Sequence, residues 1–198
     1  MSKKEHVQEE TIIYNIVTIG DSRVGKTCVI SRMCGKPFST SHITTMGVDK
    51  ISLTEKLNGK TYIIKIWDTT GQERFASLAT QYLRKADGVI FVYAVNDKDS
   101  YNNISKWVDM LKKTNANPNL QMVLVANKID LERIVSTEEG NELAQKLKMN
   151  YSETSAKTGE GIKEVYDGLV QALVKENDKK VQGQILKSGN KKEKSCCK

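Results

Sequence analysis

The segment Gly20–Thr27 constrains this chain more than any other, because its sequence GDSRVGKT matches the pattern G-x-x-x-x-G-K-[S/T]. The apolar residues Tyr14–Ile19 before it predict a strand, and Lys26–Cys34 is typical of a helix. Glycine lets backbone N–H groups turn inward around phosphate oxygens, and the following helix directs its positive end at the same anion. The pattern therefore predicts a loop that binds the phosphates of a nucleoside triphosphate. A glycine turn without a ligand is the alternative.

Two residues of this loop are expected to do specific chemistry. Lys26 would reach the β- and γ-phosphates, and the Thr27 hydroxyl would coordinate Mg²⁺. Arg23 either adds a phosphate contact or, as we favour, stays solvated. Cys28 is expected to act as a small buried apolar residue rather than a reactive thiol. The residues expected to line the nucleotide along with Lys26 and Thr27 are Asp21, Ser22, Arg23, Val24, Gly25 and Cys28.

Strand-like and helix-like segments alternate through the rest of the chain. Gly88–Val95 and Leu120–Ala126 are continuous apolar runs, as expected for strands covered on both faces. Ile51–Leu57 and Thr61–Trp67 flank Asn58-Gly59, a hairpin turn signal. Helical patterns near 100–113, 136–148 and 160–175 and a short strand at 150–152 complete the series. We therefore predict an α/β fold with a six-stranded, mainly parallel sheet, one antiparallel hairpin strand, and helices on both faces.

The choice of base is expected to lie at the ends of two later strands. In Asn127-Lys128-Ile129-Asp130, the Asp130 carboxylate can accept hydrogen bonds from guanine N1–H and the exocyclic amine, whereas adenine would leave it unpaired. Asn127 would brace neighbouring loops and approach N7, and the Lys128 stem would cover the base. In Ser155-Ala156-Lys157, the Ala156 N–H would donate to guanine O6. Guanine is therefore the predicted base.

The order of these motifs resembles that of the Ras superfamily of small GTPases over roughly residues 11–175. Within it the chain looks like a Rab, because MGVDK (Met46–Lys50) resembles IGVDF, WDTTGQERF (Trp67–Phe75) resembles WDTAGQERF, and YLRKA (Tyr82–Ala86) resembles YYRGA. The resemblance implies a P-loop NTPase G domain that binds GTP or GDP with Mg²⁺. It further implies slow GTP hydrolysis and regulation of vesicle trafficking through effectors that are recruited to membranes.

The resemblance also assigns roles in the switch. Thr45 would coordinate Mg²⁺ and meet the γ-phosphate through its N–H, Asp68 would hold Mg²⁺ through water, and the Gly71 N–H would contact the γ-phosphate. Gln72 would orient the attacking water, and Phe38 would flank the guanine ring. The metal set is thus Thr27, Thr45 and Asp68. No arginine finger is evident in the chain, so an activating protein that supplies Arg would raise the slow rate ~10³–10⁵-fold.

Besides Arg23, a large cation where many members of the family carry a smaller residue, two positions depart from the Rab pattern. Thr70 stands where the family usually has Ala, and its bulk beside the γ-phosphate predicts slower hydrolysis. Lys50 stands where the pattern has Phe, within an effector-facing cluster whose other members are Trp67 and Tyr82. Because aromatic residues often dominate interface energy, Lys50 is expected to change the set of effectors. The implied partners remain an exchange factor, an activating protein, a GDP-dissociation inhibitor and effectors, which bind a monomer through switches I and II.

The C-terminal tail carries much of the positive charge. The net charge is +7, and residues 175–198 hold eight Lys against three acidic residues, so the body is not a nucleic-acid-binding surface by charge. Cys196 and Cys197 are similar to the Rab double-geranylgeranylation signal, although Lys198 follows them. Two lipid chains with basic residues give stable anchoring. The tail predicts lipid attachment to the cytoplasmic face of an endomembrane or the plasma membrane, with cycling through the cytosol. A solvated Lys tail is the alternative.

These segments divide the chain into a flexible arm at 1–10, a GTP-binding G domain at 11–175, and a disordered basic tail at 176–198. No signal peptide or membrane span is predicted. Two other functions stay open. A GTP-locked adaptor that barely hydrolyses is favoured by Thr70 and opposed by Gln72, and turnover with an activating protein would separate it. A P-loop kinase or ATPase is opposed by Asp130, and competition of GTP against ATP would decide.

Overall fold

The computed structural model describes residues 11–39, 48–69 and 76–189. Thr45, Gly71, Gln72, Cys196 and Cys197 lie outside these ranges, as do Thr70 and residues 190–198 of the predicted tail. The described strands are β1 (Thr11–Ile19), β2 (Val48–Leu57), β3 (Lys60–Thr69), β4 (Gly88–Ala94), β5 (Gln121–Asn127) and β6 (Asn150–Thr154). The described helices are α1 (Lys26–Met33), α2 (Ala76–Leu83), α3 (Lys98–Asn102), α4 (Ile104–Thr114), α5 (Thr137–Leu147) and α6 (Ile162–Gly189).

The described strands form one six-stranded sheet in the order β2-β3-β1-β4-β5-β6. Of the pairings among them, β2 with β3 is antiparallel and the other four are parallel. Asn58 and Gly59 both have positive φ, 50° and 73°, and join Leu57 to its partner Lys60 in a two-residue hairpin turn. The predicted six-stranded sheet with one antiparallel hairpin is therefore confirmed.

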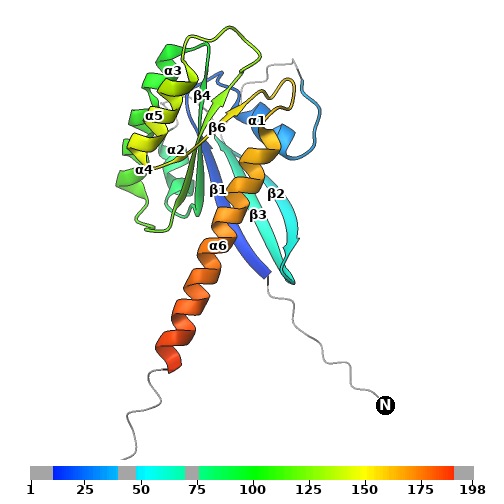
Figure 1. Ribbon diagram of the computed structural model, residues 1–198, viewed down its shortest axis with the longest axis vertical. Helices are drawn as coiled ribbons and strands as arrows, with labels where there is room; N and C mark the ends of the chain where they lie inside the picture. Colours follow the sequence, from blue (N-terminus) through cyan, green and yellow to red (C-terminus); the bar gives the residue numbers. More distant parts are fainter. Residues whose placement is uncertain (1–10, 40–47, 70–75, 190–198) are drawn as a thin grey trace, which may run out of the picture.

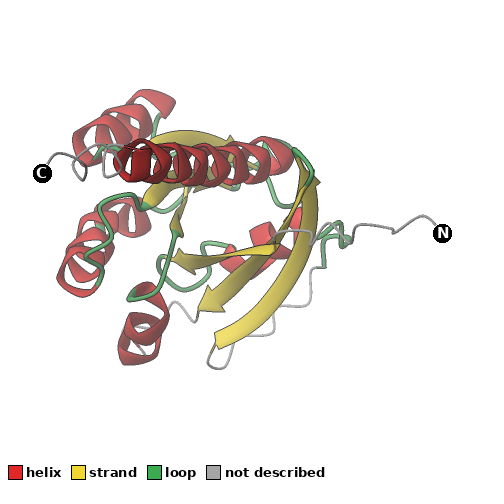
Figure 2. Ribbon diagram, turned by 90° about the horizontal axis from the view of Figure 1, so that it is seen from below, coloured by secondary structure: helices red, strands yellow, loops and turns green. Residues whose placement is uncertain are grey.

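Alternating side chains of the central strands build a core on each face of the sheet. In β4, Ile90 and Val92 pack toward α1 and α6, whereas Phe91 and Tyr93 pack toward α2, α4 and α5. Figure 2 shows helices on both sides of the strands. Because both faces are covered, the central strands read as continuous apolar runs rather than as alternating ones.

The helices differ from the sequence expectations in three places. Helix α2 was not expected, since its sequence ASLATQYL has no acidic residue in the first turn and no basic residue in the last. The helical pattern near 100–113 is divided at Asn103 into α3 and α4. Helix α6 continues to Gly189, so 176–189 is helical where a disordered linker was expected. Its many Lys, Glu and Gln residues are good helix formers even without an apolar stripe.

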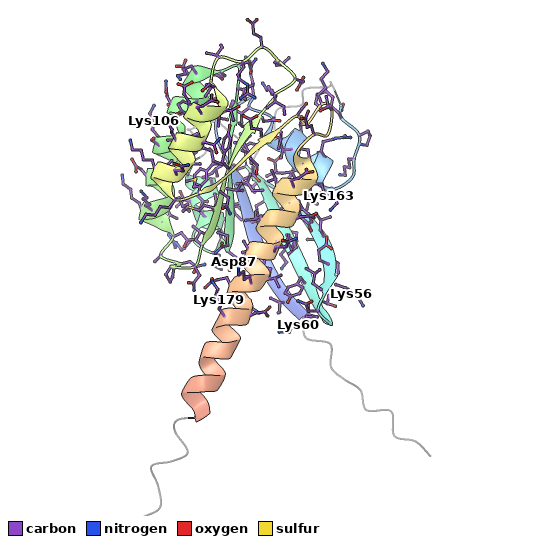
Figure 3. The ribbon with its side chains drawn as sticks, in the orientation of Figure 1. Lys56, Lys60, Asp87, Lys106, Lys163 and Lys179 are labelled. Atoms are coloured by element: carbon purple, nitrogen blue, oxygen red, sulfur yellow. The ribbon has the colours of Figure 1, made fainter. Side chains whose placement is uncertain are left out.

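The two ends of the sheet differ in what they carry. β1 ends at Ile19 and leads into α1 at the end of the sheet where α6 begins, the upper end in Figure 1. Lys56, Lys60 and Asp87 lie toward the opposite end, as does Lys179 on α6 (Figure 3). Ligands of such sheets bind beyond the carboxyl ends of the strands. None of the helices in the described ranges is long and apolar enough to cross a membrane.

Candidate functional site

The loop between β1 and α1 depends on two glycines. Gly20 has φ of 143°, and a Cβ there would lie 2.1 Å from the Val92 carbonyl oxygen. Gly25 has φ of 96°, and a Cβ there would lie 2.4 Å from Nδ2 of Asn127. Side chains at either position would meet both strain and a clash. The loop is therefore wrapped closely between β4 and β5, as the sequence pattern predicts for a phosphate-binding turn.

Lys26 is the first residue of α1, and its ammonium reaches back to the loop. Its side chain is only 6% exposed, and Nζ donates to the carbonyl oxygens of Gly20 and Asp21 at 2.9 and 2.7 Å. Burial lowers the pKa of Lys26 from 10.5 to about 8, although the charges of Asp68 and Asp21 oppose that shift. A buried ammonium held by carbonyl oxygens has one obvious complement, which is an anion inside the curve of the loop.

Helix α1 begins beside this ammonium with no side-chain cap. Its N-cap position is Gly25, which provides no side-chain hydrogen bond to the first turn. The first N–H groups of a helix have no partner within the helix and carry partial positive charge. A phosphate is the type of group that such a terminus accommodates. Arg23, with φ of 65°, is exposed, in agreement with the solvated side chain that we favoured.

A hydroxyl and a carboxylate meet at the base of the loop. Thr27 Oγ1 donates to Asp68 Oδ2 at 2.6 Å, and Asp68, near the end of β3, is only 2% exposed. Mg²⁺ prefers hard oxygen ligands and is usually held by one or two carboxylates together with phosphate oxygens. Thr27 and Asp68 therefore fit a Mg²⁺ site next to a bound phosphate. The third expected ligand, Thr45, lies outside the described residues.

Asn127 connects three segments of the site. Its Nδ2 donates to the Val24 carbonyl oxygen at 2.8 Å, and its Oδ1 accepts from Thr154 Oγ1 and from the Ala156 N–H, both at 3.2 Å. Asn127 is 1% exposed. The expected bracing role is thereby present. The Ala156 N–H, which the sequence assigns to guanine O6, is directed at Asn127 in this structure.

Asp130 lies beside the third motif. Its Oδ1 accepts a hydrogen bond from Ser155 Oγ at 2.6 Å, and its Oδ2 lies 3.7 Å from Lys157 Nζ. The Asp130 side chain is 15% exposed and that of Lys157 is 63% exposed. The carboxylate is thus oriented by one neighbour but keeps acceptor capacity, since two carboxylate oxygens offer about four lone-pair sites. Lys128 has φ of 68°, which turns the chain sharply between Asn127 and Asp130.

A small apolar cluster lies between the loop and the last motif. Val29, Ala156 and Ile162 are buried together, and Phe38 and Cys28 pack against them. Burial raises the pKa of the Cys28 thiol, which agrees with an apolar role rather than a reactive one. The structure thus places Phe38 against the same apolar cluster that contains Ala156.

Sequence reasoning missed two residues that contact the loop. Asn103 and Trp107, on α4, both donate hydrogen bonds to the Asp21 carboxylate. No sequence signal identifies such contacts, because Asp21 and Asn103 are 82 residues apart and the pair depends on how α4 packs against the sheet.

The expected effector-facing residues also lie together. Trp67 and Tyr82 stack in a tilted arrangement with ring centroids 4.4 Å apart, and Lys50 Nζ lies 5.9 Å from the Trp67 ring centroid. Lys50 is the cross-strand partner of Trp67 in the hairpin. The Lys side chain therefore extends over a surface where the family pattern has an aromatic ring.

Comparisons with known proteins agree with this geometry. The Ras family model matches residues 15–175. The chain is 38% identical over 181 residues to the Ras-related protein Rab-15 of Homo sapiens, covering 90% of this chain and 85% of the relative. It is 38% identical over 182 residues to the Ras-related protein SEC4 of Saccharomyces cerevisiae, covering 91% and 83%. It is 36% identical to the Ras-related protein RABE1e of Arabidopsis thaliana over 201 residues, covering 93% and 92%.

These matches span the loop, the strands and both base-side motifs. The chain therefore belongs to the Ras family, as a Rab-like small GTPase, the class of GTP-hydrolysing switches that regulate vesicle traffic.

Proposed function

We propose that this GTPase holds the phosphates of Mg²⁺–GTP in the loop Gly20–Thr27 and selects guanine with Asn127, Asp130 and the segment 155–157. The observation that carries the proposal is the burial of Lys26 against two loop carbonyls, beside an uncapped helix start. Among the described residues, Lys26 Nζ donates to backbone carbonyl oxygens and not to a carboxylate. Such a buried cation is stabilised strongly by an incoming phosphate. The loop residues Asp21, Ser22, Arg23, Val24, Gly25 and Cys28 would surround that phosphate chain.

The metal would be held next to the phosphates by Thr27 and Asp68, with Thr45 completing the set. When bound, Mg²⁺ neutralises charge on the β- and γ-phosphates. The 2.6 Å contact between Thr27 and Asp68 supports this assignment, because both oxygens already share one location. Lys26 would bind the same phosphates from inside the loop.

Guanine would lie between Phe38 and the Lys128 stem. Asp130 would accept hydrogen bonds from the N1–H and the exocyclic amine, while the Ser155 hydroxyl donates to its Oδ1. The Ala156 N–H would turn from Asn127 to guanine O6. Its hydrogen bond to Asn127 is long, at 3.2 Å, so little free energy is lost when it breaks. Lys157 would screen the edge of the site, since its ammonium is exposed and close to Asp130.

We also propose the switch cycle that the family resemblance implies. The Gly71 N–H would detect the γ-phosphate and Gln72 would orient the attacking water, so that hydrolysis releases the switch segments. An exchange factor, an activating protein, a GDP-dissociation inhibitor and effectors would bind there. Lys50 over Trp67 supports an effector set that differs from the aromatic Rab pattern.

Membrane attachment would come from lipids on Cys196 and Cys197 together with the basic tail. Two chains plus Lys residues give stable anchoring at an anionic cytoplasmic surface. Mass spectrometry of the cell-derived protein tests this. Prenylated C-terminal peptides in the membrane fraction are expected, and an unmodified peptide there would contradict the proposal.

Binding of nucleotide by purified, nucleotide-free protein tests the proposed site. GTP and GDP should bind in the presence of Mg²⁺, and their affinity should fall when EDTA removes the metal. Lys26→Ala should lower the affinity by at least about 100-fold, because a charge-assisted contact to phosphate is lost in a buried site. Lys146→Ala, which removes an exposed Lys from α5, is the matched control and should bind normally. Equal affinities for the two variants would contradict the assignment.

A further inference from the structure

The Asp21 side chain, in the phosphate-binding loop, is held from a distant helix. Asn103 Nδ2 donates to Asp21 Oδ2, and Trp107 Nε1 donates to Asp21 Oδ1, each at 2.7 Å. The donors lie 82 and 86 residues further along the chain, at the start of α4 and one turn into it. Both bonds are short and charge-assisted, so each oxygen of one carboxylate has its own donor.

Asn103 does not cap its own helix, and Trp107 brings a buried donor that needs a partner. Asn103 occupies the N-cap position of α4, where Asn normally accepts a hydrogen bond from the first turn, yet it makes no cap hydrogen bond. Trp107 is 6% exposed, with its ring in the core between α4 and the sheet, and a buried indole N–H needs a partner. At the start of α4, the Asn103 side chain therefore binds the phosphate-binding loop instead of capping the helix.

The same residue also contacts the phosphate-binding ammonium. The Asp21 carbonyl oxygen accepts from Lys26 Nζ at 2.7 Å, so the main chain of Asp21 faces the inside of the loop while its carboxylate faces α4. A carboxylate that turned inward would repel a triphosphate at short range. Two donors that keep it outward therefore remove a repulsion and set the curvature of the loop.

We propose that Asn103 and Trp107 are positioning residues for the phosphate-binding loop: they hold the Asp21 carboxylate away from the phosphates and so slow nucleotide release. This inference rests on the proposed nucleotide site. It makes α4 a support of the loop. Loss of either donor leaves the carboxylate partly unpaired and free to rotate toward the phosphates.

The dissociation rate constant of a fluorescent GDP analogue, measured on the full chain with Mg²⁺, tests the inference. Asn103→Ala and Trp107→Phe should each raise it about tenfold, the effect of removing one hydrogen bond to a charged group. Asn115→Ala is the matched control, because Asn115 ends α4 and donates to the Leu83 and Ala86 carbonyl oxygens instead. It should lower the melting temperature but leave GDP dissociation unchanged.

A double-mutant cycle separates positioning from general loss of structure. Asp21→Ala removes the acceptor, so adding Asn103→Ala to it should change GDP dissociation less than about twofold. A tenfold effect of Asn103→Ala that persists without the Asp21 carboxylate would overturn the inference, as would an unchanged rate in Asn103→Ala alone. Asn103→Ala preserves the core, so the cycle remains decisive even if Trp107→Phe fails to fold. A wild-type chain that retains no guanine nucleotide would overturn the proposed site, and this inference with it.

Discussion

Asn127 donates a hydrogen bond of 2.8 Å from its side-chain amide to the carbonyl oxygen of Val24, which joins the end of β5 to the phosphate-binding loop. The same side chain accepts from Thr154 and Ala156. One buried amide therefore connects the phosphate side of the site with the base side. The two sides should respond together when it is removed.

Replacement of this side chain should affect both stability and binding. Asn127→Ala leaves several buried polar groups without partners, so we expect about 3 kcal/mol of lost unfolding free energy. GTP affinity should fall by at least about tenfold. Urea unfolding and nucleotide titration measure the two effects. Asn141→Ala removes one hydrogen bond from an Asn to the Thr137 carbonyl oxygen on α5 and should cost under about 1 kcal/mol, with unchanged binding.

Gly25 has no space for a side chain. Gly25→Ala places a methyl group 2.4 Å from Asn127 Nδ2 at a φ of 96°, so the loop must move. We expect a loss of roughly 2 kcal/mol or more of stability together with impaired nucleotide binding.

Gly168→Ala on α6 provides the contrast, because nothing lies within 4 Å of a Cβ there. It should raise stability by about 0.5–1 kcal/mol and leave binding unchanged. Similar behaviour of the two variants in thermal unfolding and nucleotide titration would show that the loop is less closely packed than described.

Glu139 makes the contact between α3 and α5 sensitive to acid. Its hydrogen bonds from Lys98 and from the Ser136 N–H lower the pKa of the carboxyl below its usual 4.5. A lowered pKa in the folded state means that the stabilisation is complete above pH 4.5 and is lost as the pH falls further.

Unfolding free energies of wild type and Glu139→Gln should therefore differ at pH 7, and the difference should shrink as the pH falls below 4.5. Glu142→Gln removes an exposed carboxylate from the same helix and serves as the control. A difference between wild type and Glu139→Gln that is constant across this range would contradict the assignment.

Thr70 predicts a slow hydrolytic step. It lies outside the described residues, and in the family pattern Ala stands at this position beside the γ-phosphate. Thr70→Ala should hydrolyse bound GTP faster than wild type in a single-turnover assay, because less bulk competes with Gln72 and the attacking water. Equal rates would refute the role of the hydroxyl and its bulk.

Much of the fold was predictable because local patterns and tertiary structure agree. The continuous apolar run in β4 reflects cover on both faces, and Asn58-Gly59 marks a turn that only positive φ can form. Helix α2 was missed because its short sequence has no start signal, and it is held by packing of Leu83 in the core. The extension of α6 to Gly189 follows from helix propensity without an amphipathic pattern.

The candidate site was predictable to the extent that its residues belong to contiguous motifs. Lys26, Asn127, Asp130 and Ser155 each stand in a short pattern with its own chemistry, and the parallel sheet brings the patterns together. The contacts of Asn103 and Trp107 with Asp21 were not predictable, because they join a loop to a helix that is remote in sequence. Nothing in the local sequence of α4 distinguishes them from packing residues.

Base selection by Asp130 is the claim that one measurement tests most directly: the affinity of nucleotide-free protein with Mg²⁺ for GDP compared with ADP. We predict a preference for guanine on the order of 10⁴-fold. Asp130→Asn keeps an acceptor for Ser155 but loses the carboxylate, and it should reduce that preference by at least about tenfold. Asp109→Asn on α4 should not change it. Equal affinity of wild type for the two nucleotides, or an undiminished preference in Asp130→Asn, would contradict the account.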